Sequence, residues 1–204
     1  MYELPDVLPD TELSPGTNVL ISGPSLSGKR TLAYEILAVG ANSGQGSIVV
    51  TTKDSAEKVL SAFADLVEGE PPIGVVDCVT KQRGIGAVED DSTVKYASSP
   101  VDMTGIGIKL SEFLEEFHDG RGLTENRILL HSISTLLMYS NLQTVFRFLH
   151  VFTGRIQSVD GVGVYVIDST AHDAQTMNTL KQLFDAVIEL EGDADNPTIR
   201  TSGF

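Results

Sequence analysis

The stretch from Val19 to Leu37 constrains the fold of this chain more than any other part of the sequence. It has the pattern of an apolar strand, a loop bounded by glycines and a helix. Gly23, Gly28 and Lys29 have the G-x-x-x-x-G-K spacing of a phosphate-binding loop. In such a loop, backbone N–H groups and the helix N-terminus surround phosphate oxygens, while the lysine reaches the terminal phosphates. The residues predicted to form this phosphate cradle are Gly23, Pro24, Ser25, Leu26, Ser27, Gly28, Lys29, Arg30 and Thr31.

Arg30 departs from the motif. The motif places Ser or Thr directly after the lysine, because that hydroxyl ligates Mg²⁺. Thr31 offers a hydroxyl one residue later, but one residue along a helix rotates a side chain by about 100°. The loop alone therefore does not show whether the protein binds and hydrolyses nucleotide. That depends on the residues at the ends of the other strands.

Strands and helices alternate along the chain, which implies right-handed crossovers and an α/β fold with a mostly parallel sheet. Strands are predicted at 17–23, 47–52, 73–79, 94–97, 127–132, 162–168, 186–191 and 198–202. Helices are predicted at 29–42, 55–67, 104–117, 142–156 and 174–184. The strand–turn–strand pattern at the end predicts an antiparallel edge. Residues 1–16 read as an N-terminal arm, 17–204 as a single domain, and 80–103 as a long surface loop.

Composition narrows the classes of partner. The chain has 14 Lys and Arg against 28 Asp and Glu, a net charge of −14, which opposes autonomous binding to nucleic acid. The acid excess and low lysine count favour a surface adapted to a salty cytoplasm, as in a halophile. No apolar run approaches the roughly 20 residues of a membrane span. Neither a secretion signal nor a disulfide partner for Cys78 is evident, so we expect a cytoplasmic protein.

The segment after the second strand lacks a clear catalytic acid. A phosphate-loop ATPase needs groups at other strand ends to hold Mg²⁺ and to orient the attacking water. Lys53 is basic where a catalytic glutamate would be useful. Asp54 directly precedes a helix, so capping that helix, alone or with Ser55, is its most economical role.

The ends of the strands predicted at 127–132 and 162–168 are also unusual. His131 stands where an aspartate would hold the magnesium-bound water, and a neutral imidazole is a poor Mg²⁺ ligand. We expect a hydrogen-bonded histidine beneath the loop rather than a metal ligand. Asp168 and His172 form either a sensor-like polar pair or, with Ser169 and Thr170, part of a turn and helix cap.

Together these segments resemble the RecA-like ATPases, most nearly the KaiC/RadA branch of archaea. The matching segments cover residues 12–203 and run from the Gly-Pro opening of the loop through the strand ending at His131 to the terminal strands. The resemblance implies a RecA-like P-loop NTPase three-layer fold, ATP or ADP as ligand, and assembly into rings or filaments. Arg30, His131 and Lys53 stand at the family's hydroxyl, Walker B and first strand-two glutamate positions, and we expect them to meet around one space. Degenerate KaiC-like proteins of halophilic archaea resemble this chain most.

We therefore expect a degenerate RecA/KaiC-like protein with a regulatory or scaffold role, and we assign no catalytic residue and no metal ligand. A second hypothesis is that nucleotide binds without Mg²⁺, with Arg30 supplying part of the missing charge. A third is a slow ATPase in signalling or DNA recombination and repair, using Asp54 or Asp168. Protein partners or self-assembly are expected, with residues 4–13 and 81–99 as contact surfaces or, alternatively, as disordered segments.

Overall fold

The structure is a computed structural model that describes residues 1–8, 12–84, 86–192 and 197–204. Parts of the predicted arm (9–11) and of the predicted loop (85) lie outside the described residues. Among the described residues, no helix has the length and apolar character needed to cross a bilayer.

A sheet of 8 strands runs through the described part of the chain in the order β4-β3-β2-β5-β6-β1-β7-β8. Its strands are β1 (Asn18–Gly23), β2 (Gly46–Thr51), β3 (Ile73–Asp77), β4 (Val94–Tyr96), β5 (Asn126–His131), β6 (Val162–Asp168), β7 (Ala186–Glu191) and β8 (Thr198–Ser202). All neighbouring pairs are parallel except β7 and β8. The predicted α/β class and the antiparallel edge are confirmed, and every residue of β1, β2 and β5 is buried, as central parallel strands require.

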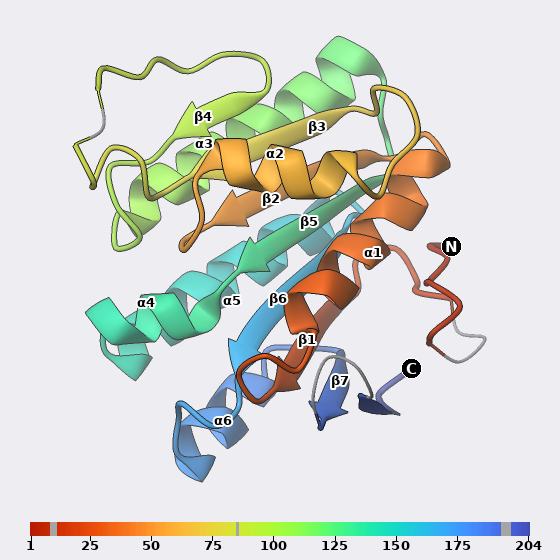
Figure 1. Cartoon of the computed structure of the whole chain (residues 1–204), viewed down its shortest axis with the longest axis vertical. Coiled ribbons are helices and arrows are strands. Elements are labelled where there is room, and N and C mark those ends of the chain that lie inside the picture. Colours follow the sequence, from red (N-terminus) through yellow and green to blue (C-terminus); the bar gives the residue numbers. More distant parts are fainter. Residues whose placement is uncertain (9–11, 85, 193–196) are drawn as a thin grey trace.

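Helices cover both faces of the sheet (Figure 1), which produces three layers. They are α1 (Lys29–Asn42), α2 (Ala56–Ala64), α3 (Met103–Glu115) with its π-helical continuation η1 (Glu116–Gly120), α4 (Ile133–Tyr139), α5 (Leu142–Ser158) and α6 (Ala174–Lys181). Val19 and Ile21 of β1 pack in the core under α1 and α2, while Leu20 packs in the core under α3 and α5. This alternation follows from the period of two in a strand.

Helix α4 is absent from the predicted elements. Ser132 caps it by accepting a hydrogen bond from the N–H of Thr135 at 3.4 Å, and Ile133 and Leu136 bury its inner face. The third strand is shorter than predicted. It ends at Asp77 because the Asp77 carboxylate accepts the N–H groups of Val79 and Thr80, each at 2.8 Å, and turns the chain.

The described parts of the N-terminal arm pack against the domain. Tyr2 pairs with Leu13 in an antiparallel bridge, and its hydroxyl donates to the carbonyl of Asp160 at 2.8 Å. Tyr2, Leu8 and Leu13 belong to the core under α1 and α2. The alternative of a disordered arm is therefore wrong for Tyr2, Leu8 and Leu13. The described part of the long loop also has internal hydrogen bonds, since Asp91 accepts the N–H of Val94 at 2.7 Å.

Candidate functional site

The predicted phosphate cradle lies between the end of β1 and the start of α1. Gly28 is the N-cap of α1 with a φ of 84°, a left-handed conformation that favours glycine, and no side chain caps this helix among the described residues. The first N–H groups of α1 are therefore available to an anion. A Cβ on Gly23 would lie 2.8 Å from both the Leu190 carbonyl oxygen and Ser27 Oγ, so the loop requires glycine there.

Lys29 closes the loop on itself. Its Nζ donates to the carbonyl of Pro24 and to Ser27 Oγ at 3.4 Å, and the residue is only 9% exposed. Burial lowers the pKa of Lys29, an effect that the nearby Asp168 carboxylate opposes. A phosphate that entered the cradle would replace these internal acceptors of the ammonium group.

Arg30 forms an ion pair with Asp54. Its Nη1 donates to Asp54 Oδ2 at 3.1 Å, and Lys58 donates to Oδ1 of the same carboxylate at 2.5 Å. Burial would raise the pKa of Asp54, but the hydrogen bond from Lys58 and the charges of Lys58 and Arg30 hold it below its ordinary value. Asp54 is thus an anionic partner for two cations.

The expected capping role of Asp54 is wrong. Ser55 occupies the N-cap of α2 but makes no side-chain capping bond. The N–H of Ala56 instead donates to Asp77 Oδ2, at 2.8 Å, from the end of the neighbouring strand β3. Asp54 is free for Arg30 and Lys58 because a residue from another strand satisfies the helix.

His131 lies at the end of β5, buried among the charged groups of the site, and is only 7% exposed. Burial lowers its pKa to about 4; Asp54 opposes this, while Lys53, Arg30 and Lys29 add to it. The imidazole is therefore neutral at pH 7. The sequence predicts a hydrogen-bonded histidine, but its buried Nδ1 has no hydrogen-bond partner among the described residues. Arg30 and Lys53 lie close enough to His131 for their charges to lower its pKa, which supports the expectation that these three residues surround one space.

Asp168 joins the loop to the end of β6. It accepts a hydrogen bond from Ser25 Oγ of the loop, and its Oδ1 accepts the N–H and hydroxyl of Thr170 at 3.0 and 2.8 Å. Burial would raise the pKa of Asp168, but the bonds from Ser25 and Thr170 and the charge of Lys29 lower it. The predicted turn bonds are present, while the helix cap comes from Asp173, which accepts the N–H of Thr176 at 2.7 Å.

Ser134 connects Asp168 with His172. Its hydroxyl accepts the N–H of Asp168 at 2.9 Å and lies 2.8 Å from His172 Nε2. The two residues of the predicted polar pair are therefore linked through α4, which sequence reasoning missed. Ser134 could have been found because it follows the β5 end by three residues. Lys58 could have been found from its i,i+4 spacing to Asp54.

The residues present do not fit the Mg²⁺ ion that the resemblance implies. Mg²⁺ requires hard oxygen ligands. Each carboxylate oxygen of Asp54, Asp77 and Asp168 already accepts a hydrogen bond from a protein donor. Thr31 is exposed on α1, and the described residues contain no group of three or more His, Cys, Asp or Glu arranged for a metal.

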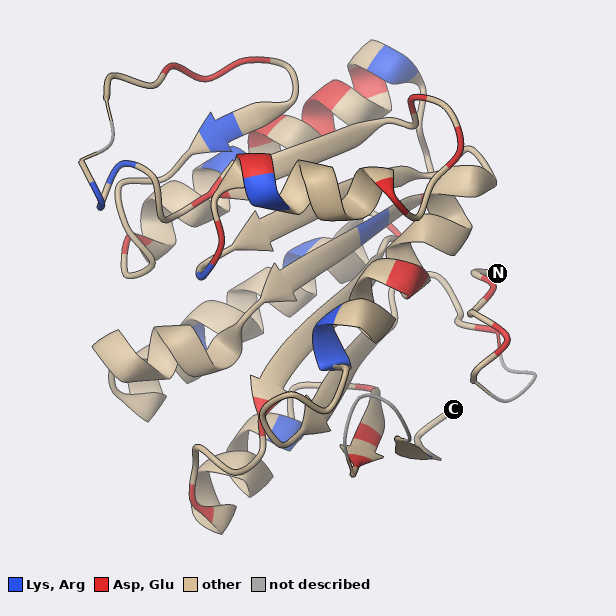
Figure 2. Cartoon of the chain, viewed as in Figure 1, with Lys and Arg blue, Asp and Glu red and all other residues tan. Residues whose placement is uncertain are grey.

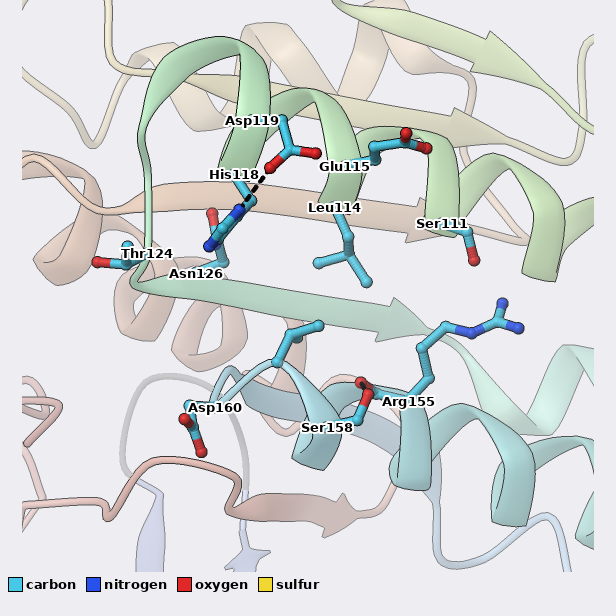
Figure 3. Close-up of a pocket in the computed structure, with 11 residues that line it drawn as sticks. Ser111, Leu114, Glu115, His118, Asp119, Thr124, Asn126, Arg155, Ser158 and Asp160 are labelled. Carbon is cyan, nitrogen blue, oxygen red and sulfur yellow. Dashed lines mark hydrogen bonds and ion pairs between the residues drawn. The ribbon is translucent and has the colours of Figure 1, made fainter.

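A cavity of about 600 Å³ lies at the opposite end of the sheet, near the start of β5. Figure 3 shows it between α3 with η1 on one side and α5 on the other. Leu114 and Val159 line it together with polar side chains, and Arg155 turns its guanidinium to the carbonyl of Gly107, 2.6 Å away. Asn126 starts the strand that His131 ends, so this cavity is separate from the phosphate cradle.

Comparison with protein families gives one match. The model described as "Family of unknown function (DUF7504)" matches residues 16–190. Comparison with curated proteins gave no significant match.

Solved structures share the fold at low sequence identity. The uncharacterized protein PH0321 from Pyrococcus horikoshii, solved in complex with an unknown peptide, aligns over 94% of both chains with a TM-score of 0.68 and 13% identity. The KaiC-like protein PH0186 from Pyrococcus horikoshii OT3 aligns over 93% of this chain and 79% of its own, with a TM-score of 0.56 and 14% identity. The flagellar accessory protein FlaH from Methanocaldococcus jannaschii aligns over 93% and 78%, with a TM-score of 0.52 and 11% identity. These similarities confirm the RecA/KaiC-like fold.

Proposed function

The chain belongs to this family of unknown function (DUF7504), and we propose that it binds the phosphates of ATP or ADP without efficient hydrolysis and acts as a regulatory or scaffold protein. The observation that carries the proposal is the Arg30–Asp54 ion pair beside a neutral His131. In this arrangement Lys29 and the α1 N-terminus can still bind phosphate. The metal-ligating hydroxyl and the acid that hydrolysis needs are replaced by Arg30 and His131.

The cradle supports the binding half of the proposal. Gly23 and Gly28 keep the backbone conformation in which the loop wraps around an anion. Lys29 lies inside the loop, and its hydrogen-bond acceptors in the described part of the chain are the loop's own oxygens. Charge-assisted hydrogen bonds to phosphate oxygens are stronger than those to neutral acceptors, so a phosphate is a better partner for this ammonium group.

The groups around the cradle support the absence of hydrolysis. Phosphoryl transfer depends on electrostatic stabilisation by a metal ion and on a group that orients water. Asp54 and Asp168, the acids nearest the loop, are both committed to internal donors. Loss of such transition-state stabilisation costs about two to three orders of magnitude per interaction.

A protein that binds nucleotide without hydrolysing it efficiently can still act as a regulator or a scaffold. FlaH is described as an accessory protein, and PH0321 was solved with a peptide bound. We propose by analogy that this chain acts through protein partners or self-assembly in the cytoplasm. The acid excess supports a salt-adapted surface and opposes autonomous binding to nucleic acid.

Calorimetric titration with ATP and ADP, with and without Mg²⁺, on wild type and on Lys29→Ala tests this proposal. We expect binding by wild type, a loss of at least about tenfold in Lys29→Ala because a charge-assisted bond is removed, and phosphate release at background level. Lys181→Ala is the matched control, since that lysine of α6 pairs with Glu189 of β7 and lies outside the loop.

Two results would contradict the proposal. If wild type binds no nucleotide in any condition, the loop has only a structural role. Phosphate release that disappears in Lys29→Ala would instead establish the slow ATPase, with Asp54 or Asp168 as its acid. Salt-sensitive retardation of DNA in a gel would favour a role in recombination or repair.

A further inference from the structure

Four cationic side chains lie at the carboxyl edge of the sheet, beside the acids Asp54, Asp77 and Asp168, in a protein that is strongly acidic overall. Lys29 and Arg30 begin α1, Lys53 lies in the β2–α2 loop, and Lys58 lies in the first turns of α2. Figure 2 shows Lys and Arg positions in blue at the start of α1, in the β2–α2 loop and on α2, with acidic positions in red beside the last two. The net charge of the whole chain is −14, so this concentration of cations is a local feature and not a property of the surface.

Asp54 holds two of these cations while leaving them accessible. Its side chain is 8% exposed, whereas those of Arg30 and Lys58 are 45% and 60% exposed. The carboxylate is therefore a buried counter-ion, and the guanidinium and ammonium groups can turn from it toward a solvent-borne anion. Because these two cations are themselves partly exposed, they need little further desolvation to share their charge between Asp54 and a solvent-borne anion.

We propose that this site selects a polyphosphate that carries no metal ion, and that Mg²⁺ weakens its binding. The inference rests on the proposed binding of nucleotide phosphates and adds which ionic form of the ligand is bound. It follows from the disagreement between the residues present and the Mg²⁺ that the fold implies.

Electrostatics gives the direction of the effect. Mg²⁺ neutralises two negative charges of a triphosphate, and those charges are what Lys29, Arg30 and Lys53 would attract. It would also place a divalent cation beside Arg30, with no free carboxylate to compensate, because both oxygens of Asp54 already accept hydrogen bonds. His131, where the fold usually has an acid, adds no negative charge because burial keeps it neutral.

The experiment is a titration of the full chain with ATP, in EDTA and in excess Mg²⁺, at matched ionic strength. Matching is needed because salt alone screens these interactions. We expect Mg²⁺ to weaken ATP binding by about tenfold. Inorganic tripolyphosphate in a parallel arm separates recognition of phosphates from recognition of the nucleoside, and it should show the same Mg²⁺ effect.

Arg30→Thr tests whether Arg30 is responsible. This variant should bind metal-free ATP about tenfold more weakly and lose most of the penalty that Mg²⁺ imposes. Arg147→Ala is the matched control, because it removes the same charge from an exposed position on α5, across the sheet from α1. It should leave both affinities unchanged.

The outcomes separate this inference from the proposed function. If ATP binds and Mg²⁺ tightens it, the inference is overturned while nucleotide binding stands. If ATP binds equally with and without Mg²⁺, the inference is also overturned. If neither ATP nor tripolyphosphate binds under either condition, both the inference and the proposed function fail.

Discussion

Arg30 at the start of α1 donates to Asp54 after β2 at 3.1 Å, across a separation of 24 residues in the chain. The bond joins two positions at which a catalytic P-loop protein would hold a metal-ligating hydroxyl and an acid. A guanidinium therefore supplies positive charge beside the cradle where the fold would use Mg²⁺. Because Asp54 already binds Arg30, any anion that enters the cradle must compete with Asp54 for the guanidinium group.

Asp54→Asn should tighten binding of metal-free ATP by about three- to tenfold, because it removes the negative charge that competes with phosphate for Arg30 and Lys58. Stability should change by at most about 1 kcal/mol, since both cations are largely exposed and can be solvated. Calorimetric titration in EDTA measures the first effect and urea unfolding the second. Glu57→Gln, which removes a charge from an exposed position nearby, is the control; an equal gain there would show a general charge effect.

Gly28→Ala should abolish phosphate binding at a modest cost in stability. Gly28 has a φ of 84° at the N-cap of α1, and a Cβ in that conformation costs about 1 kcal/mol. Relief of the strain would turn the N–H groups of the loop away from the ligand. Gly44→Ala is the control, since Gly44 has a φ of 82° and open space around it. It should lose the same stability but keep wild-type affinity, and lost affinity in Gly44→Ala would contradict the argument.

Stability should fall as pH drops from about 6.5 to about 4, because burial lowers the pKa of His131 to about 4. In this window the unfolded chain binds a proton that the folded chain does not. The contribution of neutral His131 to the free energy of unfolding is therefore complete above pH 6.5. It falls by at most about 3 kcal/mol as pH approaches 4. Asp54 and Asp168, whose pKa values are lowered, lose their contribution only as pH falls further.

Urea unfolding across this pH range, on wild type and on His131→Asn, measures the effect. The variant should show a flatter dependence of unfolding free energy on pH between 6.5 and 4. His118→Asn is the control, since that side chain is 65% exposed and makes its bond to the neighbouring Asp119. An unchanged slope in His131→Asn would show that the histidine is solvated in the folded protein.

Arg127→Met should destabilise the fold by about 3 to 5 kcal/mol. The guanidinium is buried and donates to Gln45 Oε1, the Glu3 carbonyl and the Ile36 carbonyl, each at 2.7 Å. Its removal takes away a donor from all three acceptors and one of the bonds that hold the N-terminal arm. The midpoint of urea unfolding reports the loss, and Arg121→Met, at an exposed position, should cost less than about 1 kcal/mol. Equal effects in both variants would refute this role.

The sequence by itself determined the order of the elements and the cradle, because these depend on residues within one strand, one loop or one helix turn. Continuous apolar runs predicted β1, β2, β5 and β6, the strand–turn–strand pattern at the end predicted the antiparallel edge, and Gly23, Gly28 and Lys29 located the loop. The absence of an acid at His131 and of a hydroxyl at Arg30 was likewise readable from spacing alone. The strand at 73–79 was too long in that interpretation, because the turn at Asp77 is made by a side chain and not by glycine or proline.

Only the tertiary structure decided what the polar residues at the strand ends do. Asp54 has the sequence context of a helix cap, yet Asp77 caps α2 because β3 lies beside β2 in the sheet and brings its carboxylate to Ala56. Asp54 is then left to Arg30 and Lys58. Tyr2 and Asp160 meet although 158 residues separate them. Such pairings follow from the order of strands in the sheet, and a local pattern carries no information about which distant donor reaches a given carboxylate.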